Sequence, residues 1–265
     1  EALIEYASYG QVIFMTVMAL AGATGPATLA GLLVQQNAEV LSGLLIAHLV
    51  NPHAPVIYGN VSCPMDMRTG DSSTGSPEVG LLGAGFVQLA KYYGMPCSVG
   101  AQCNARVPDA QASYEKMTSL MMGVLAGADL VDLFAGTIES FRTASYEQLV
   151  IDNELAGMAL RCAEGIEVNA ETLARDVIDR VGPGGNFLAD KHTSKWFRKE
   201  HYQSTLGDRR TRAAWEKSGS KDIREQARDR ARDILASPEP EPIDPTIWIE
   251  IELIIEEVEE GALKG

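Results

Sequence analysis

The chain has few residues of the kinds that bind metals or form disulfides. It contains 4 cysteines and 4 histidines in 265 residues, and no two cysteines stand at CxxC spacing. Neither a zinc motif nor a disulfide framework is indicated. We therefore expect free thiols, a cytoplasmic location and no metal bound by the chain itself.

Positive charge is also scarce. The 22 Lys and Arg residues are outnumbered by 36 Asp and Glu, which gives a net charge of -14 at pH 7. Nucleic-acid affinity depends on Lys and Arg side chains that displace counterions from phosphates, so we predict no nucleic-acid partner. Solubility accounts for most of the acidic excess, and a cationic or neutral small substrate remains compatible with it.

Long uncharged apolar runs are missing as well. A membrane-spanning helix needs about 20 such residues. The longest candidate, residues 29–50, is interrupted by four polar side chains, namely Gln35, Gln36, Asn37 and Glu39. We predict a buried helix there and no membrane partner.

What the sequence does contain is an alternation of short β-rich runs with long helical stretches, which indicates βα units. The strands are expected at 12–18, 55–61, 129–134 and just before residue 102, and the helices that follow them at about 28–50, 77–93, 109–126 and 146–164. Near-continuous apolar strands are typical of a parallel sheet covered on both faces. The fold class is therefore α/β.

Beyond residue 165 the pattern is helical only. Helices are expected at about 171–181, capped by Asn169, and then at 190–200, 211–218 and 222–236. Prolines between 237 and 245 predict an extended linker, and an amphipathic helix follows at 247–263. We expect three regions: a partial (β/α) barrel at 1–165, a helical extension at 166–236, and the linker with its C-terminal helix at 237–265.

The predicted βα units amount to half of a closed eight-stranded barrel, and half a barrel would leave two unpaired sheet edges. Either the other half belongs to a longer chain or two copies complete each other. The chain begins Glu1-Ala2-Leu3 without an initiator Met. We expect it to be a piece of a longer protein.

Parallel α/β proteins place their chemistry where strands end and helices begin. The third predicted strand ends in Gln102-Cys103-Asn104, just before a helix that opens at Pro108-Asp109. Cys103 would be a nucleophile only if a base lowered its pKa, and none of the four histidines follows a strand. We favour a structural thiol. A lyase or aldolase would need a Lys at a strand end, and the predicted strand ends offer none.

Two loops are further candidates. The loop at 21–26, which contains Gly22 and Thr24, could bind an anion with its backbone N–H groups, although a tight turn is favoured. The loop at 62–76 places Asp66 between Met65 and Met67. Methionines in that position suit either a packed loop or a surface for a large flat ligand.

Two aromatic residues lie near strand ends, Tyr58 in the second strand and Phe134 in the fourth. Aromatic faces attract quaternary ammonium groups, at roughly 0.5 to 2 kcal/mol each. The alternative is that both rings cap the core. Asn60, close to Tyr58, is a further candidate for substrate contact.

Several segments together resemble the trimethylamine methyltransferase family. They follow one another in order over nearly the whole chain: 21–26, 36–40, 55–59, 65–70, 75–78, 107–111, 145–149, 152–157, 181–188 and His192-Thr193. The resemblance implies a TIM-barrel methyltransferase, of which this chain is the C-terminal half. Members take a methyl group from an amine and pass it to the cobalt of a corrinoid (cobalamin) carried by a separate protein, which docks over the barrel mouth.

The trimethylamine members carry pyrrolysine in the loop that here reads Ala101-Gln-Cys-Asn104. The position corresponds to Gln102, or to Cys103 if the register shifts by one. A quaternary ammonium needs no activation, because its positive charge already makes a neutral amine a good leaving group. The resemblance therefore implies that this chain acts on a quaternary amine such as glycine betaine.

The resemblance also implies roles for the candidate residues. Gln102 and Asn104 would act at the catalytic position by orienting the substrate through hydrogen bonds. The substrate contacts would come from four further side chains, Tyr58, Asn60, Phe134 and Asp66. The corrinoid contacts would come from Gly22, Thr24 and Met65. We expect a homo-oligomer, and the alternative function is an inactive barrel fragment that serves as a docking platform for the corrinoid protein.

Overall fold

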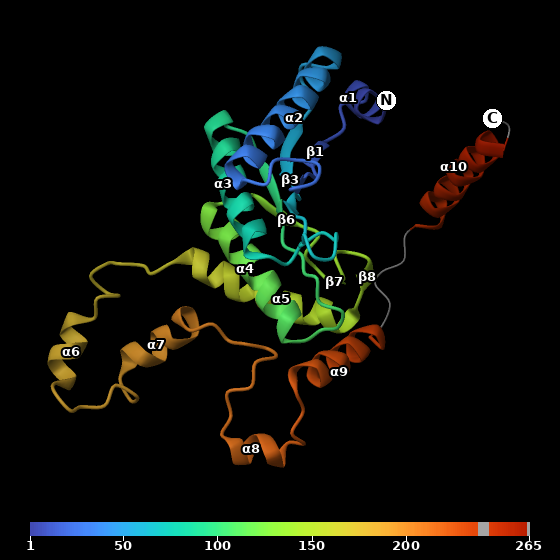
Figure 1. Cartoon of the computed structure of the whole chain (residues 1–265). Coiled ribbons are helices and arrows are strands. Elements are labelled where there is room, and N and C mark those ends of the chain that lie inside the picture. Colours follow the sequence, from blue (N-terminus) through green and yellow to red (C-terminus); the bar gives the residue numbers. More distant parts are fainter. Residues whose placement is uncertain (238–243, 264–265) are drawn as a thin grey trace. The chain divides into compact units, whose positions relative to one another are not determined.

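A computed structural model describes residues 1–237 and 244–263 of the chain (Figure 1). Its centre is a four-stranded parallel sheet in the order β1-β3-β5-β6. The strands are β1 (Ile13–Val17), β3 (Val56–Asn60), β5 (Cys97–Gly100) and β6 (Leu130–Asp132). The predicted parallel α/β arrangement is confirmed, because the order of these strands in the sheet follows their order in the chain.

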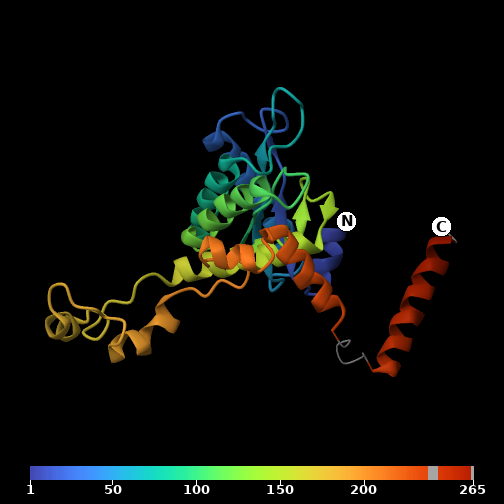
Figure 2. The same ribbon diagram turned by 90° about the horizontal axis from the view of Figure 1, so that it is seen from below.

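Each connection between neighbouring strands contains one helix: α2 (Leu29–Val50), α3 (Pro77–Tyr93) or α4 (Ala110–Ala126). All three helices lie along the same side of the sheet (Figures 1 and 2). Alternate strand residues point toward them and form the main core, which includes Val17, Tyr58, Cys97 and Val99 with Leu32, Val40, Leu82 and Phe86 from the helices. Because these helices cover one side of the sheet, the strand residues that point to the other side remain available for a site.

The opposite face of the sheet is open in this chain. Phe14 of β1 and Leu130 of β6 lie on that face and are 49% and 42% exposed. The expectation of a sheet covered on both faces is therefore met on one face only in this chain. In a closed (β/α) barrel, this face of the strands would point to the interior.

The helix boundaries follow from local chemistry that the sequence already contained. Pro77 occupies the first turn of α3, and Gly94 ends that helix with φ 68°. The Asp109 side chain accepts from Ala112 N at the start of α4, and Ser145 accepts from Gln148 N at the start of α5 (Tyr146–Glu164). The predicted starts and ends of these helices are confirmed to within one residue.

Five short elements were not predicted. They are α1 (Ala2–Ser8), the parallel pair β2 (Leu20–Ala21) and β4 (Cys63–Pro64), and the antiparallel pair β7 (Thr137–Ile138) and β8 (Thr143–Ala144). Strands of 2 residues are too short to show a hydrophobic period. The strands β2 and β4 pair the loop after β1 with the loop after β3, and β7 and β8 form a hairpin within the loop after β6.

The helices after residue 165 are α6 (Arg175–Val181), α7 (Lys191–Glu200), α8 (Arg212–Lys217) and α9 (Ile223–Leu235). The expected helix at 171–181 begins later than predicted. Asn169 Oδ1 accepts from the backbone N–H groups of Glu171 and Thr172 and forms a turn, and Ala174, with φ 49°, separates that turn from α6. The side chain that was read as a helix cap stabilises an isolated turn instead.

The chain divides into two compact units, Glu1–Ala231 and Arg232–Gly265. In the first unit, Leu206 and Ala227 join a core cluster with Ile151 and Leu155 of α5. The second contains α10 (Pro245–Leu263), which confirms the predicted C-terminal helix. Most of the predicted proline linker, residues 238–243, lies outside the described residues.

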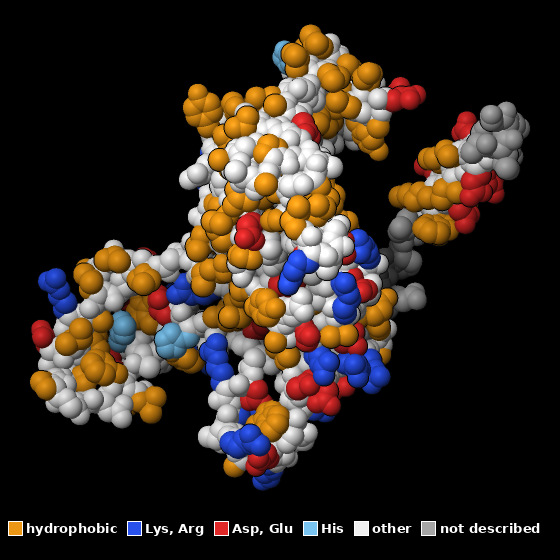
Figure 3. Space-filling model, viewed as in Figure 1, with side chains coloured by type: hydrophobic (Ala, Val, Ile, Leu, Met, Phe, Trp, Pro, Cys, Tyr) orange, Lys and Arg blue, Asp and Glu red, His pale blue; other side chains and the backbone are white. Residues whose placement is uncertain are grey.

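Helix α2 is long and apolar enough, by length and composition alone, to cross a membrane. Its residues Leu32, Val40 and Ala47 are buried against the sheet, whereas Val34 and Leu49 on the other side are 72% and 74% exposed. The predicted burial of this helix therefore holds for one face only. Figure 3 shows hydrophobic side chains gathered over this part of the molecule.

Candidate functional site

The loops at the carboxyl ends of the strands join into one surface. Met65 N donates to Ala21 O at 3.1 Å, which ties the loop after β3 to the loop after β1. Figure 2 shows these two loops side by side. Gly75 N donates to Asn104 Oδ1 at 2.8 Å, and Ser140 N donates to Cys103 O at 2.8 Å, which add the loops after β5 and β6.

The three residues expected to contact a corrinoid lie together on this surface. Gly22 has φ 88°, and a Cβ placed on it would lie 3.4 Å from Met67 Sδ. Thr24 Oγ1 accepts from Leu20 N at 2.8 Å, and Met65 bonds to the same loop through its backbone. Met67 is 73% exposed beside them. Exposed thioether surface next to a tight turn fits the edge of a large flat ring, and the contact itself stays a prediction.

Asn104 holds the loops together with its side chain. Both of its amide hydrogens are used, because Nδ2 donates to Ser72 O at 2.8 Å and to Ser140 Oγ at 2.9 Å. Its Oδ1 accepts from Gly75 N, as described above. The side chain is hydrogen-bonded to two neighbouring loops, after β3 and after β6, so a direct substrate contact would have to compete with these bonds.

Two adjacent charged residues of α4 anchor the same region from below, and the sequence analysis had missed both. Glu115 Oε2 accepts from Asn104 N at 2.7 Å. Lys116 Nζ donates to Phe134 O at 2.5 Å and to Asp152 Oδ2 at 2.6 Å, and the side chains of Lys116 and Asp152 are 0% exposed. A buried charge on an otherwise ordinary helix face gives no periodic signal.

Asp152 extends this anchor to the turn after β6. Its Oδ2 also accepts from Gly136 N at 2.7 Å, and its Oδ1 accepts from Gln148 Nε2 at 2.7 Å. Burial raises the pKa of the Asp152 carboxyl, and Lys116 opposes that shift. The pair fixes the backbone at Phe134 and Gly136.

The position of Tyr58 corrects the expectation that its ring cages a substrate. Tyr58 is fully buried in the core between the sheet and the helices, with its ring centroid 4.2 Å from that of Phe86. Its hydroxyl donates to Asn37 Oδ1 of α2 at 2.5 Å, and burial raises its pKa. The ring faces the helices, away from the open face of the sheet.

Asn60, two residues further along β3, points the same way. Its Oδ1 accepts from Gln36 Nε2 of α2 at 2.7 Å and from Ser62 N at 2.9 Å. The alternation of side chains along a strand explains why both candidates face α2. Nearness to a strand end predicts a site residue without assigning its side chain to a face of the sheet.

Phe134 lies at the carboxyl end of β6 and is 8% exposed. Its ring already has a cation near it, since Lys116 Nζ lies 5.2 Å from the centroid. The ring also belongs to the core cluster formed with α4 and α5. The core reading of Phe134, which the sequence analysis left open, is the one that these contacts favour.

Asp66 is engaged within its own loop. Its carboxylate accepts from Arg68 N at 2.8 Å and from Arg68 Nη2 at 3.2 Å, and the Arg68 guanidinium lowers the pKa of Asp66. These bonds stabilise the turn at 66–70. A substrate contact at Asp66 stays a prediction.

Gln102 differs from the other candidates, because it is 1% exposed and neither Oε1 nor Nε2 has a hydrogen-bond partner among the described residues. The amide folds back over Gly100, where an added Cβ would lie 2.8 Å from Gln102 Nε2. The adjacent Cys103 is 1% exposed, and burial raises the pKa of its thiol to about 11. The thiol is therefore protonated near neutral pH, which agrees with the expected structural role.

A second polar group on the open face was missed by the sequence analysis. Ser98 Oγ of β5 donates to Asp132 Oδ2 of β6 at 2.7 Å. Asp132 Oδ1 is buried without a partner among the described residues, and burial raises the pKa of this carboxyl. Strand parity could have identified the pair, because Val99 and Val131 between them point to the helices.

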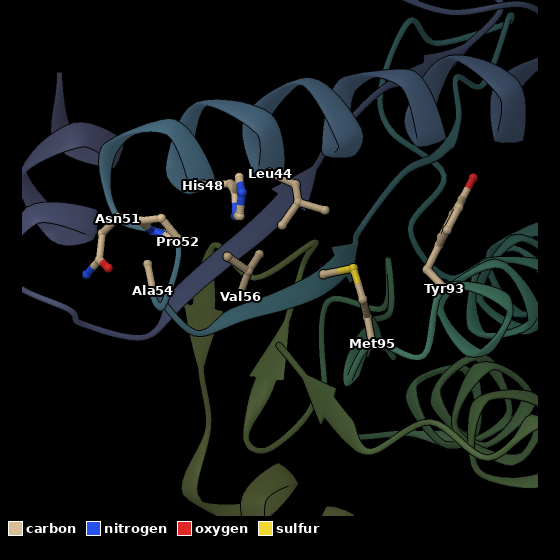
Figure 4. Close-up of a pocket in the computed structure, with 8 residues that line it drawn as sticks. All are labelled: Leu44, His48, Asn51, Pro52, Ala54, Val56, Tyr93 and Met95. Carbon is tan, nitrogen blue, oxygen red and sulfur yellow. The ribbon is translucent and has the colours of Figure 1, made fainter.

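A hollow of about 400 Å³ lies at the other end of the sheet. Figure 4 shows Leu44 and His48 of α2 facing Val56 and Met95 across it. It lies at the amino-terminal ends of β3 and β5, whereas α/β proteins place their sites at the carboxyl ends. Within the described parts of the chain, no group of three or more His, Cys, Asp or Glu residues is arranged to hold a metal ion.

Comparison with known proteins gives a consistent result. A family model described as trimethylamine methyltransferase (MTTB) matches residues 1–260. A glycine betaine methyltransferase of Desulfitobacterium hafniense strain Y51 is 42% identical over 255 residues, which cover 96% of this chain and 53% of that protein.

Two further relatives are trimethylamine methyltransferases. One, from another strain of Desulfitobacterium hafniense, is 41% identical over 98% of this chain and 52% of its own length. The other, from Methanosarcina mazei, is 39% identical over 100% of this chain and 53% of its own length. The chain thus spans about half the length of the curated relatives that it matches.

Proposed function

Because this chain belongs to the trimethylamine methyltransferase family, we propose that its protein transfers a methyl group from a quaternary amine of the betaine class to the cobalt of a corrinoid protein. The identity values alone do not choose the amine, since a glycine betaine enzyme and a trimethylamine enzyme match at 42% and 41%. The choice rests on residue 102. Where the resemblance places pyrrolysine in the trimethylamine members, this chain has a glutamine.

The observation that carries the proposal is the state of that glutamine. Gln102 lies at the carboxyl end of a central parallel strand and is almost fully buried, with both amide atoms unpartnered among the described residues. Buried polar groups in native proteins nearly always have partners, and an exception needs an explanation. A bound substrate with a hydrogen-bonding carboxylate would supply the partner.

The proposed reaction requires little general acid–base catalysis from the protein. The corrinoid supplies the nucleophile as cobalt(I), and the carbon–nitrogen electron pair leaves with a neutral amine. The chain's own residues have to orient the methyl carbon and exclude water. Gln102 would hold the substrate, while Asn104, Glu115 and Lys116 would keep the loops around it in place.

The surface of adjoining loops above the strands supports a docking role for the partner protein. The loops that contain Gly22, Thr24 and Met65 are hydrogen-bonded to each other at the carboxyl ends of β1 and β3. In a complete TIM barrel these loops would ring the mouth. The closed barrel, the corrinoid contacts and a homo-oligomer are parts of the same proposal.

A second candidate follows from the open face of the sheet. A chain with four parallel strands and an exposed inner face could present the docking loops without completing a reaction site. It would then be an inactive platform for the corrinoid protein.

The two candidates differ in one measurement. The complete protein is mixed with glycine betaine and a corrinoid protein reduced to cobalt(I), and methyl-cobalt absorbance is followed. An active methyltransferase produces that absorbance, whereas a platform binds the corrinoid protein and leaves its spectrum unchanged.

A further inference from the structure

Ser98 and Asp132 form a hydrogen-bonded polar pair on the open face of the sheet. Val99 and Val131 alternate with them and pack into the core on the helix side. Ser98, Gly100 and Asp132 therefore point to the opposite face. The proposed function uses neither member of the pair.

The Asp132 carboxylate is only half satisfied. Oδ2 accepts from Ser98 Oγ at 2.7 Å, whereas Oδ1 is buried with no partner among the described residues. Among the described residues, Asp132 forms no salt bridge with a Lys, Arg or His side chain. Leaving a buried carboxylate oxygen unpaired costs free energy, so the arrangement needs a reason.

The unpartnered amide of Gln102 lies close to the same place. Gly100 is the register partner of Asp132 in the adjoining strand. Gln102 folds its amide back over Gly100, where an added Cβ would lie 2.8 Å from Nε2. One buried donor, Gln102 Nε2 just after β5, and one buried carboxylate oxygen, Asp132 Oδ1 at the end of β6, thus lie at the ends of neighbouring strands, and both lack partners among the described residues.

We propose that Asp132 is the counter-charge for the ammonium group of the substrate, with Gln102 Nε2 donating to the substrate carboxylate. This inference rests on the function proposed above and deepens it. A carboxylate and an amide donor on adjacent strands are complementary to a zwitterion that carries a cation and a carboxylate a short distance apart. Ser98 holds the Asp132 carboxylate in place and leaves Oδ1 free for the cation.

The Asp132 carboxylate would also favour a substrate that carries a permanent positive charge. A quaternary ammonium cannot donate a hydrogen bond, so it offers charge without a directional partner. A fixed carboxylate in a partly desolvated site interacts more strongly with that charge than it would in water. A neutral molecule of the same shape would leave the carboxylate buried and uncompensated.

The test uses glycine betaine and tert-butylacetate, in which carbon replaces the ammonium nitrogen without a change of shape. Calorimetric titration of the complete protein, without the corrinoid protein, measures both dissociation constants in the absence of turnover. We expect wild type to bind glycine betaine about tenfold or more tightly than tert-butylacetate. Asp132→Asn should lose most of that preference, mainly through weaker binding of glycine betaine.

The matched control is Asp129→Asn, in the segment just before β6. Asp129 Oδ2 accepts from Cys97 N at 2.9 Å, which ties this carboxylate to the residue of β5 that faces the helices. This variant should keep the wild-type preference. An Asp132→Asn protein that retains the preference overturns the inference, as does a wild-type protein that binds both compounds equally.

Failure of the proposed function looks different. A wild-type protein that binds neither compound would refute the betaine-class substrate, and the inference would fall with it. Wild-type methyl transfer from glycine betaine with an unchanged preference in Asp132→Asn would refute the inference alone. The urea midpoint of Asp132→Asn shows whether the variant folds, so that a lost preference is distinguished from a lost structure.

Discussion

Lys116 Nζ and Asp152 Oδ2 lie 2.6 Å apart, and both side chains are completely buried beneath the loop after β6. The pair links α4 to α5 and also binds two backbone groups, Phe134 O and Gly136 N. The loop after β6 thus rests on a buried ion pair.

Removing one member of that pair should destabilise the protein strongly. Lys116→Met leaves the Asp152 carboxylate buried without its cation, and we expect the free energy of unfolding to fall by about 3–5 kcal/mol. Lys116→Met combined with Asp152→Leu should recover part of the loss. Urea denaturation measures both. A single variant within about 1 kcal/mol of wild type would contradict a buried, compensated pair.

Asn104 should be required for order in the loops more than for chemistry. Asn104→Ala removes the hydrogen bonds to Ser72, Gly75 and Ser140, and we expect faster hydrogen exchange at the Gly75 amide and a loss of about 1–3 kcal/mol in stability. Asn186→Ala is the control, because Asn186 is a surface residue whose side chain accepts from Leu188 N. Unchanged exchange at Gly75 would refute the role assigned to Asn104.

Tyr58 should affect stability and leave substrate affinity unchanged. Tyr58→Phe removes the hydroxyl that donates to Asn37, which should lower the free energy of unfolding by about 0.5–1.5 kcal/mol. Tyr92→Phe is the control, because Tyr92 is 83% exposed. KM for the amine should be the same in both variants. A higher KM for Tyr58→Phe with normal stability would show instead that the hydroxyl contacts the substrate.

Asp132 should make the protein less stable as the pH rises. Burial raises the folded-state pKa of Asp132 above its ordinary value of 3.8, so the folded state keeps the proton to a higher pH than the unfolded state does. The stabilising contribution of the protonated Asp132 carboxyl is fully present below pH 3.8 and is lost as the pH rises through its folded-state pKa. Asp132→Asn should therefore be more stable than wild type near pH 7, with the difference shrinking toward about pH 4.

Urea midpoints of wild type and Asp132→Asn across this pH range measure the effect. A difference that does not vary with pH would show that the carboxyl of Asp132 titrates normally. The prediction concerns the protein without substrate, because a bound ammonium group would stabilise the ionised carboxylate.

Sequence patterns were sufficient to predict the successive βα units of the fold. The βα units from β1 to α5 follow from alternating hydrophobic periods, and their boundaries follow from single residues such as Asp109, Ser145 and Gly94. The pairs β2–β4 and β7–β8 could not be predicted, because each strand has 2 residues, too few to show a hydrophobic period. The strands β2 and β4 are, in addition, far apart in the chain.

Only some residues of the candidate site could be predicted from the sequence, for a related reason. Nearness to a strand end selected Gln102, whose amide lies over Gly100 on the open face, but it also selected Tyr58 and Asn60, which point to α2. Strand parity separates the two groups, and parity depends on the register of strands only 3–5 residues long. Lys116 and Asp152 lie on helices, and their contact with the loop after β6 depends on tertiary packing.

The most direct test of the account is the amine preference of methyl transfer to a corrinoid protein. The complete protein is incubated with a cobalt(I) corrinoid protein and either glycine betaine or trimethylamine, and the absorbance of methyl-cobalt is recorded. We predict that glycine betaine yields methyl-cobalt and trimethylamine does not. Methyl-cobalt from trimethylamine, or none from any quaternary amine of the betaine class, would contradict the account.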